Sequence, residues 1–472
     1  MLKKCQIILF FICKTYTFTK NQLTFNIMKK ILLTGFALVA LMAQAQISWV
    51  PQATKLPVNN GIKEIVIVNA NTVWATAYDG AGGGTYPKTT TKTTNGGASW
   101  TATPITGLGG NALISDITAI DGNTAWIVTA PSGTGANANK IWKTVNGGAN
   151  WTLQPSGYTS GSFANHIYFW DANNGWSSGD PLNGKFEMFK TNNGGTTWTS
   201  VAGALAPESA DEFTYVGLRK VVGDNMWVGT STGRIMRSAD RGATWAVSSS
   251  PVLDFGGVIT SGSSGSFAFK DANKGLLLAI DGNDSAFLYS TSNGGAGWDP
   301  VTPNGPWYFG DISYVPGTAN TYISTGVNSS SEDFMGSSYS TDGGLNWTAI
   351  DSGEQRGTLA MLNSTTGWAG QFSDGPAGTK GILKLNGNLS LAVADNAVKS
   401  ALQVYPNPAT DVVTVSAKKS IETINIFDLS GKKVKSFKGA EQINVSSLAK
   451  GTYLLQVYYG GGSVETTKLM KK

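Results

Sequence analysis

Short apolar stretches alternate with turn-forming residues along most of the chain, and this alternation predicts an all-β protein. A large apolar residue recurs at nearly constant intervals and starts a predicted second strand in each unit. Several of these residues follow a polar turn such as Asp121-Gly122-Asn123. A period near fifty residues suits four short antiparallel strands, which is one blade of a β-propeller. The seven residues are Trp74, Trp126, Trp176, Trp227, Leu276, Tyr322 and Trp368, at steps of 52, 50, 51, 49, 46 and 46.

An eight-residue phrase, Ser/Thr-x-Asp/Asn-x-Gly-x-x-Trp, lies between these residues and occurs six times. Its Asp or Asn side chain can accept hydrogen bonds from the following backbone amides, and its glycine can adopt a positive φ. Its tryptophan starts the next strand and can pack against the sheet. We therefore expect a structural role for the six pairs Asn95 and Trp100, Asn146 and Trp151, Asn193 and Trp198, Asp240 and Trp245, Asn293 and Trp298, and Asp342 and Trp347.

The count of seven apolar markers and six phrases is explained if the two ends of the repeat region share one blade. Gly381-Ile382-Leu383-Lys384-Leu385 resembles a third strand with no phrase after it, and Ile47-Ser48-Trp49-Val50 resembles a fourth strand with no blade before it. Pairing the two would close the ring and remove an exposed sheet edge. The sequence thus predicts a seven-bladed β-propeller over residues 46–390.

The phrase resembles the Asp-box (BNR) repeat of sialidases, sortilins, some glycoside hydrolases and photosystem assembly factors. In those proteins the box lies on a hairpin remote from the ligand site. The resemblance therefore implies that the six boxes have a structural role and that ligands bind on the other face of the propeller.

A separate module is expected at residues 403–472, after a linker of small residues at 391–402. Period-two alternation over short strands predicts a small Ig-like β-sandwich. The module resembles the type A C-terminal sorting domain of the type IX secretion system in Bacteroidetes. The matching parts are Tyr405-Pro406-Asn407-Pro408, the run from Phe427 to Lys432, and Gly451-Thr452-Tyr453-Leu454-Leu455.

The sorting-domain resemblance implies contact with the type IX secretion machinery and export across the outer membrane. Removal of the domain would then leave a secreted or surface-attached protein. The alternative from the sequence is an adhesive Ig-like domain that stays on the mature chain.

The first 45 residues are interpreted as an N-terminal extension, 1–27, and a signal peptide, 28–45. Basic Met28-Lys29-Lys30 precedes an apolar run from Ile31 to Met42 and an Ala43-Gln44-Ala45 cleavage site, so we expect cleavage after Ala45. The run is too short for a membrane span. The two cysteines, Cys5 and Cys13, precede this site, so we expect neither disulfides nor thiolate chemistry in the mature chain.

The net charge of +5 conceals an acidic central region. Residues 1–45 carry six lysines and no acid, and residues 403–472 carry ten lysines and five acids. Residues 46–402 carry 19 basic and 25 acidic side chains, hence 19 − 25 = −6. A nucleic-acid partner is not expected, because it would need a basic stripe.

Candidate ligand residues come from the loops opposite the boxes, where acidic and aromatic residues gather. No loop has the Asp-x-Asp-x-Asp spacing of a calcium site, so we predict no metal and no cofactor. Tyrosine, tryptophan and carboxylates also suit a sugar ligand. His166, the single histidine, should lie beside the loop of Asp180, with Glu187 close by. The predicted ligand-binding residues are His166, Asp180, Glu187, Glu212 and Trp307.

The chain lacks the active sites of the enzymes that share the box. Sialidases of this type use three arginines and an Arg-Ile-Pro phrase, but no arginine precedes Arg219 and the phrase is absent. The related endoglucanases use carboxylates from two propellers, and the basic ligand face of the photosystem factors is not reproduced here. We expect an exported, monomeric, non-catalytic binding module for an extracellular glycan or protein, with no catalytic residue assigned. The alternative is a secreted glycoside hydrolase or lyase that uses carboxylates of the acidic face.

Overall fold

A computed structural model describes residues 47–133, 138–283, 285–327, 335–390, 402–417, 420–428, 432–460 and 464–472. The chain divides into two compact units, residues 1–390 and 391–472. The described residues contain strands, bridges and turns, and none of their segments is a helix long and apolar enough to cross a membrane. The predicted signal peptide with Cys5 and Cys13, and all but the last residue of the predicted linker, fall outside the described residues.

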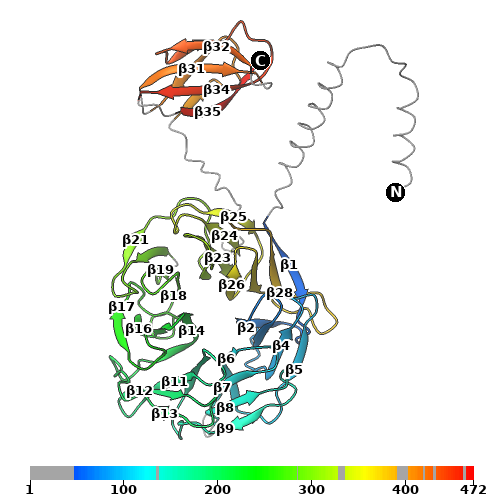
Figure 1. Cartoon of the computed structure of the whole chain (residues 1–472), viewed down its shortest axis with the longest axis vertical. Coiled ribbons are helices and arrows are strands. Elements are labelled where there is room, and N and C mark those ends of the chain that lie inside the picture. Colours follow the sequence, from blue (N-terminus) through cyan, green and yellow to red (C-terminus); the bar gives the residue numbers. More distant parts are fainter. Residues whose placement is uncertain are drawn as a thin grey trace, which may run out of the picture. The chain divides into compact units, whose positions relative to one another are not determined.

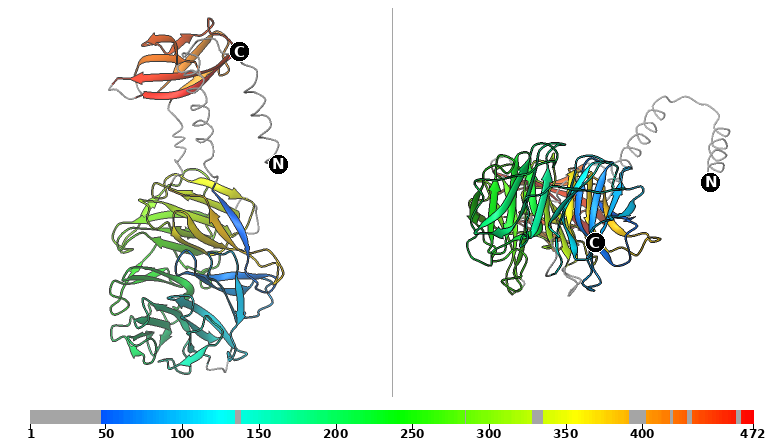
Figure 2. Two further views of the ribbon diagram at one scale, coloured as in Figure 1. Left: turned by 45° about the vertical axis from the view of Figure 1, so that its right-hand side comes forward. Right: turned by 90° about the horizontal axis from the view of Figure 1, so that it is seen from below.

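The described part of the first unit contains seven four-stranded antiparallel sheets, which stand side by side around a ring (Figure 1). The strands of each sheet run between the two faces of this ring, as the edge-on view of Figure 2 shows. In six of the sheets the four strands follow one another in sequence. The first three are β2 (Asn60–Ile67), β3 (Val73–Asp79), β4 (Thr89–Thr93) and β5 (Thr101–Pro104); β6 (Ala112–Ala119), β7 (Ala125–Pro131), β8 (Lys140–Thr144) and β9 (Thr152–Gln154); and β10 (Ala164–Phe169), β11 (Gly175–Leu182), β12 (Lys185–Thr191) and β13 (Thr199–Ser200).

The next three sheets repeat this plan, and the all-β propeller architecture expected from the period is present. They are β14 (Thr214–Val222), β15 (Asn225–Thr230), β16 (Arg234–Ser238) and β17 (Ala246–Ser249); β18 (Ser264–Phe269), β19 (Gly275–Ile280), β20 (Ala286–Thr291) and β21 (Asp299–Val301); and β22 (Asp311–Tyr314), β23 (Tyr322–Val327), β24 (Met335–Ser340) and β25 (Thr348–Ser352).

The remaining sheet joins the two ends of the unit. It has the order β1-β28-β27-β26, with β1 (Ser48–Ala53), β26 (Leu359–Asn363), β27 (Thr366–Gly370) and β28 (Gly381–Asn386). The predicted pairing of these ends is confirmed, because Trp49 lies opposite Leu385 in an antiparallel register. The side-chain oxygen of Gln52 accepts hydrogen bonds from the indole N–H groups of Trp368 and Trp100, each at 3.1 Å. Gln52 therefore ties this sheet to the first box.

The six eight-residue phrases adopt the predicted turn. In the first, the Thr93 hydroxyl accepts a hydrogen bond from the Gly97 amide at 2.9 Å, and the Asn95 side-chain oxygen accepts one from the Ser99 amide at 2.9 Å. Gly97 has a φ of +87°, a conformation that residues with a Cβ rarely adopt. The same two hydrogen bonds recur in the other five phrases at 2.8 to 3.0 Å.

These turns also hold neighbouring sheets together. Trp126, which is fully buried, donates its indole N–H to the carbonyl of Gly194 in the next sheet at 3.2 Å. Lys143, opposite Trp126 on the adjacent strand, donates to the same carbonyl at 3.3 Å and lies 4.7 Å from the Trp126 ring centroid. Such cation–π contacts add to the hydrophobic gain of a buried ring. The sequence did not predict this second function of the box.

The second unit contains two sheets, with the orders β29-β30-β33 and β32-β31-β34-β35. Apolar side chains of both sheets, including Val413, Ile424 and Leu455, form one buried cluster. The strands are β29 (Gln403–Tyr405), β30 (Val412–Ser416), β31 (Ile421–Phe427), β32 (Lys433–Lys438), β33 (Gln442–Asn444), β34 (Gly451–Tyr459) and β35 (Val464–Lys471).

Replacing Trp126 tests the link between sheets. Trp126→Ala should lower the free energy of unfolding by about 3–5 kcal/mol, because it leaves a cavity and removes a buried hydrogen bond. Trp126→Phe keeps an aromatic ring and should cost about 1 kcal/mol for the lost hydrogen bond. Urea unfolding measures both, with Phe287→Ala at a half-exposed position as the control. An alanine variant as stable as wild type would contradict this role of Trp126.

Replacing Gln52 tests the closing sheet. Gln52→Ala leaves two indole N–H groups without their acceptor and should destabilise the protein by about 1–3 kcal/mol. Gln154→Ala is the control, since the Gln154 side chain bonds only to carbonyls of its own strand, and should lie within about 0.5 kcal/mol of wild type. Equal melting temperatures for the two variants would rule out a stabilising role for Gln52.

Candidate functional site

The two faces of the first unit differ in the loops they carry. Each box bonds to the turn between the first two strands of its own sheet. In the second sheet, for example, the Gly147 amide donates to the Asn123 carbonyl at 2.9 Å. We call the face that carries these turns the box face. On the opposite, loop face, the end of the second strand or the loop after it bonds to the loop before the first strand. Examples are Gly80 to Asn59 at 3.0 Å and Asp180 to Phe163 at 2.9 Å.

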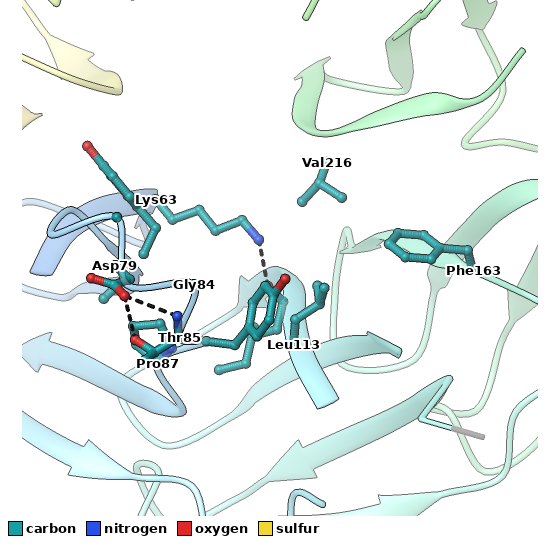
Figure 3. A pocket seen from close by; sticks show the side chains of 13 residues that line it. Lys63, Asp79, Gly84, Thr85, Pro87, Leu113, Phe163 and Val216 are labelled. Carbon is teal, nitrogen blue, oxygen red and sulfur yellow. Dashed lines mark hydrogen bonds between the residues drawn. The ribbon is translucent and has the colours of Figure 1, made fainter. Parts of the chain in front are cut away.

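A pocket of about 610 Å³ opens where the innermost strands of four sheets begin, which is on the loop face. Its walls are mostly apolar and come from sheets far apart in sequence. Figure 3 shows Lys63 extending across the pocket towards Leu113, with Phe163 and Val216 beyond it. Tyr78, Tyr86, Pro87 and Ile114 complete the apolar part of the lining, and both tyrosines are more than a third exposed.

The polar groups of this pocket are largely engaged with one another. Asp79 accepts hydrogen bonds from the amides of Ala81 and Thr85 and from the Thr85 hydroxyl. Lys63 donates to the Ile114 carbonyl at 2.6 Å. Burial lowers the pKa of Lys63, because an ammonium is less stable away from water. No carboxylate of the described residues lies within ion-pair distance of Lys63.

A second cavity of about 320 Å³ shares Lys63 and Val216 with the first and extends along the inner strands of the remaining sheets. Much of its wall is glycine, including Gly217, Gly265 and Gly357. A Cβ on Gly217 would lie 2.5 Å from the Glu64 carboxylate oxygen, so this glycine makes room for Glu64. The two cavities together form the channel mouth.

Two aspartates on inner strands join neighbouring sheets; Asp311 lines the second cavity, and Asp116 lies outside both linings. Asp116 accepts the Ile167 amide of the next sheet at 2.9 Å and pairs with Arg219, whose Nε and Nη2 donate to the carboxylate at 3.0 to 3.1 Å. Asp311 accepts the Leu359 amide of its next sheet at 2.9 Å and lies 3.7 Å from the Lys220 ammonium. Each aspartate therefore has a countercharge from β14.

Glu64 differs from these aspartates, because it has no countercharge of its own. Burial, with the nearby charge of Asp116, raises the pKa of Glu64 to about 8, although Arg219, Lys63 and Lys220 act in the opposite direction. At neutral pH the Glu64 carboxyl is therefore mostly protonated and can donate a hydrogen bond.

His166 lies in the interior of the unit. Its side chain is fully buried, and its Nδ1 lies 4.0 Å from Asp116. Burial, followed by the charges of Arg219 and Lys63, holds the pKa of His166 well below its ordinary value, so the ring is neutral. The structure does not place His166 in either cavity of the channel mouth.

The other four predicted ligand residues also lie outside the channel mouth. Asp180 accepts a hydrogen bond from Asn165 at 2.6 Å, and burial raises its pKa to about 6. Glu187 accepts one from the Ser162 hydroxyl at 2.9 Å and contributes to the raised pKa of Asp180, so the two carboxyl groups are neighbours.

Glu212 and Trp307 make contacts inside the protein. The buried Glu212 carboxylate pairs with Arg234 and accepts the Glu208 amide, so it holds its own loop. Trp307 packs 6.2 Å from Trp347, centroid to centroid. Their role in ligand binding stays a prediction.

The sequence contains a signal for one position on the innermost strand of several sheets. Glu64, Asp116 and His166 lie ten residues before Trp74, Trp126 and Trp176, and each follows a bulge in its strand. The same offset before Trp227 and Leu276 leads to Gly217 and Ser266, which line the second cavity as Glu64 does. Before Tyr322 it leads to Ile312, which packs in an apolar cluster, so the offset finds cavity-lining positions in only some of the sheets.

Comparison with known families and proteins concerns the two units separately. Residues 403–472 match the secretion system C-terminal sorting domain. This match supports export of the chain, contact with the type IX secretion machinery, and a secreted or outer-membrane surface location. No curated protein matches the chain.

Several solved structures are similar to the chain. YCF48 from Cyanidioschyzon merolae is 14% identical with a TM-score of 0.50, covering 73% of this chain and 99% of its own. A GH74 enzyme from Niastella koreensis is 14% identical with a TM-score of 0.46, covering 89% and 79%. PorZ of Porphyromonas gingivalis, a surface component of the type IX secretion system, is 15% identical with a TM-score of 0.46, covering 89% and 61%. The likeness to YCF48 supports the β-propeller fold alone.

The difference in stability between the wild-type protein and a Glu64→Gln variant should depend on pH. Glu64 in the unfolded chain ionises near its ordinary value of 4.5, but in the folded protein it keeps its proton up to about pH 8. The folded state therefore binds more protons between these values, and stability falls as pH rises through this window. We expect Glu64→Gln to have the same melting temperature as wild type at pH 4 and a higher one at pH 8 to 9. A constant difference across this range would contradict the assignment.

Proposed function

We propose that the protein is an exported, non-catalytic binding module that takes an extracellular ligand at the channel mouth. The observation that carries this proposal is the pocket of about 610 Å³, lined by Tyr78, Tyr86 and Phe163 and reached from the loop face. Ligand sites are typically concave and mostly apolar, with a few placed polar groups. Lys63 and Glu64 supply these polar groups.

In this proposal the seven sheets of residues 46–390 are the blades of one Asp-box propeller, and the tail of residues 403–472 is an Ig-like sandwich. The linker is residues 391–402, and the signal peptide, residues 28–45, is cleaved after Ala45. The exported protein acts as a monomer on a glycan or protein outside the cell, with neither metal nor cofactor. No group of three His, Cys, Asp or Glu side chains suited to a metal ion occurs among the described residues.

A secreted glycoside hydrolase or lyase is the second candidate, and the carboxyl pair Asp180 and Glu187 favours it. Burial raises the pKa of both groups, which a general acid requires. Each, however, is held by a neighbouring side chain, Asn165 or Ser162. Turnover on a polysaccharide panel that is lost in Asp180→Asn or Glu187→Gln would establish this alternative.

A steric block tests the binding proposal. Val216 lines both cavities, so Val216→Trp should fill the channel mouth and weaken binding of glycan-array or peptide-array ligands at least about tenfold. The control is Val145→Trp, because Val145 is 67% exposed within a box turn on the other face. Melting temperatures show that both variants fold. Ligand binding that survives Val216→Trp unchanged would refute a site at the channel mouth.

A further inference from the structure

Lys63 is the cation of the channel mouth without a countercharge. Arg219 pairs with Asp116, and Lys220 lies beside Asp311. The Lys63 ammonium has the Ile114 carbonyl as its hydrogen-bond partner within the described residues, and an ammonium can donate three hydrogen bonds. Its neighbour Glu64 is mostly protonated at neutral pH and does not neutralise it.

A half-buried ammonium with spare donors favours an anion, since charge-assisted hydrogen bonds are stronger than neutral ones and strengthen away from water. The side chains around Lys63 then indicate which chemical groups adjoin the anion in the ligand. Leu113, Ile114 and Val216 are aliphatic, and Phe163, Tyr78 and Tyr86 add aromatic rings. The anion should therefore lie next to a bulky apolar group.

The lining favours a peptide over a sugar. Each sugar hydroxyl that enters a pocket needs a hydrogen-bond partner, and an unpaired one is costly. Asp79 and Thr85 of the loop wall already bond to one another. An acidic polysaccharide would also meet a propeller region with a net charge of 19 − 25 = −6, whereas a peptide can carry a single carboxylate on an apolar segment.

We infer that the channel mouth binds a peptide segment in which a carboxylate adjoins one or two bulky apolar side chains, with the carboxylate on the Lys63 ammonium. The carboxylate is either a chain end or an acidic side chain. This inference rests on the proposed function and specifies its ligand class.

Calorimetry on the full chain with four probes tests this inference. The first is acetyl-Gly-Gly-Leu-Phe with a free carboxyl end, and the second is the same peptide with an amide end. The third is acetyl-Gly-Leu-Phe-Asp with an amide end, which moves the carboxylate to a side chain. The fourth is tetragalacturonate, an acidic glycan. We expect the first or third peptide to bind at least about tenfold tighter than the second. The tighter of these two peptides shows whether the carboxylate is a chain end or an acidic side chain.

Lys63→Met should remove this preference while it leaves the weak binding of the amide peptide within about twofold of wild type. Lys63→Arg should restore part of it. Lys185→Met, which removes an exposed lysine on a loop-face hairpin, is the matched control and should keep the preference. Melting temperatures separate a lost contact from a lost fold.

Equal affinity for the acid and amide peptides, or a preference that persists in Lys63→Met, would overturn the inference. So would tetragalacturonate binding where the peptides do not bind. If a ligand from the array is blocked by Val216→Trp but none of the peptides binds, the inference is wrong and the proposed function stands. If Val216→Trp blocks no ligand, the proposed function itself fails.

Discussion

Hydrogen bonds to the backbone carbonyl of a glycine in the box turn join one sheet to the next. Gly194 accepts both Trp126 and Lys143 from the preceding sheet, and Gly96 accepts Lys384 at 2.7 Å where the ring closes. This contact needs a tight turn with positive φ, a buried tryptophan and a basic residue opposite it. The box turn therefore stabilises the contact between sheets as well as its own hairpin.

The closed ring explains why charge gathers at the channel mouth. Seven first strands converge there, and their inward side chains come within reach of one another across the ring. Buried carboxylates require countercharges and hydrogen bonds, and β14 supplies Arg219 to Asp116 and Lys220 to Asp311. Lys63 and Glu64 line the second cavity beside these pairs, and neither has an ion-pair partner among the described residues.

The period, the box turn and the pairing of Trp49 with the last sheet could be predicted, because each depends on local pattern or on the need to cover an edge. The channel mouth could not be predicted, because the pairing of Arg219 with Asp116 spans 103 residues and exists only once the ring is closed. His166 was predicted to bind a ligand as the single histidine, but its side chain is fully buried and lines neither cavity. Lys63 had no such distinction in the sequence.

The chemistry of the channel mouth favours recognition over hydrolysis. Glu64, with a pKa of about 8, could act as an acid, but a glycosidase needs a second carboxylate to act as nucleophile or base. Asp116 is occupied by Arg219 and two backbone amides, and Asp311 by two amides, the Ser266 hydroxyl and the nearby Lys220. Freeing either would break contacts that hold adjacent inner strands together. In the proposed function, the protonated Glu64 carboxyl and the Lys63 ammonium instead offer hydrogen-bond donors to a ligand.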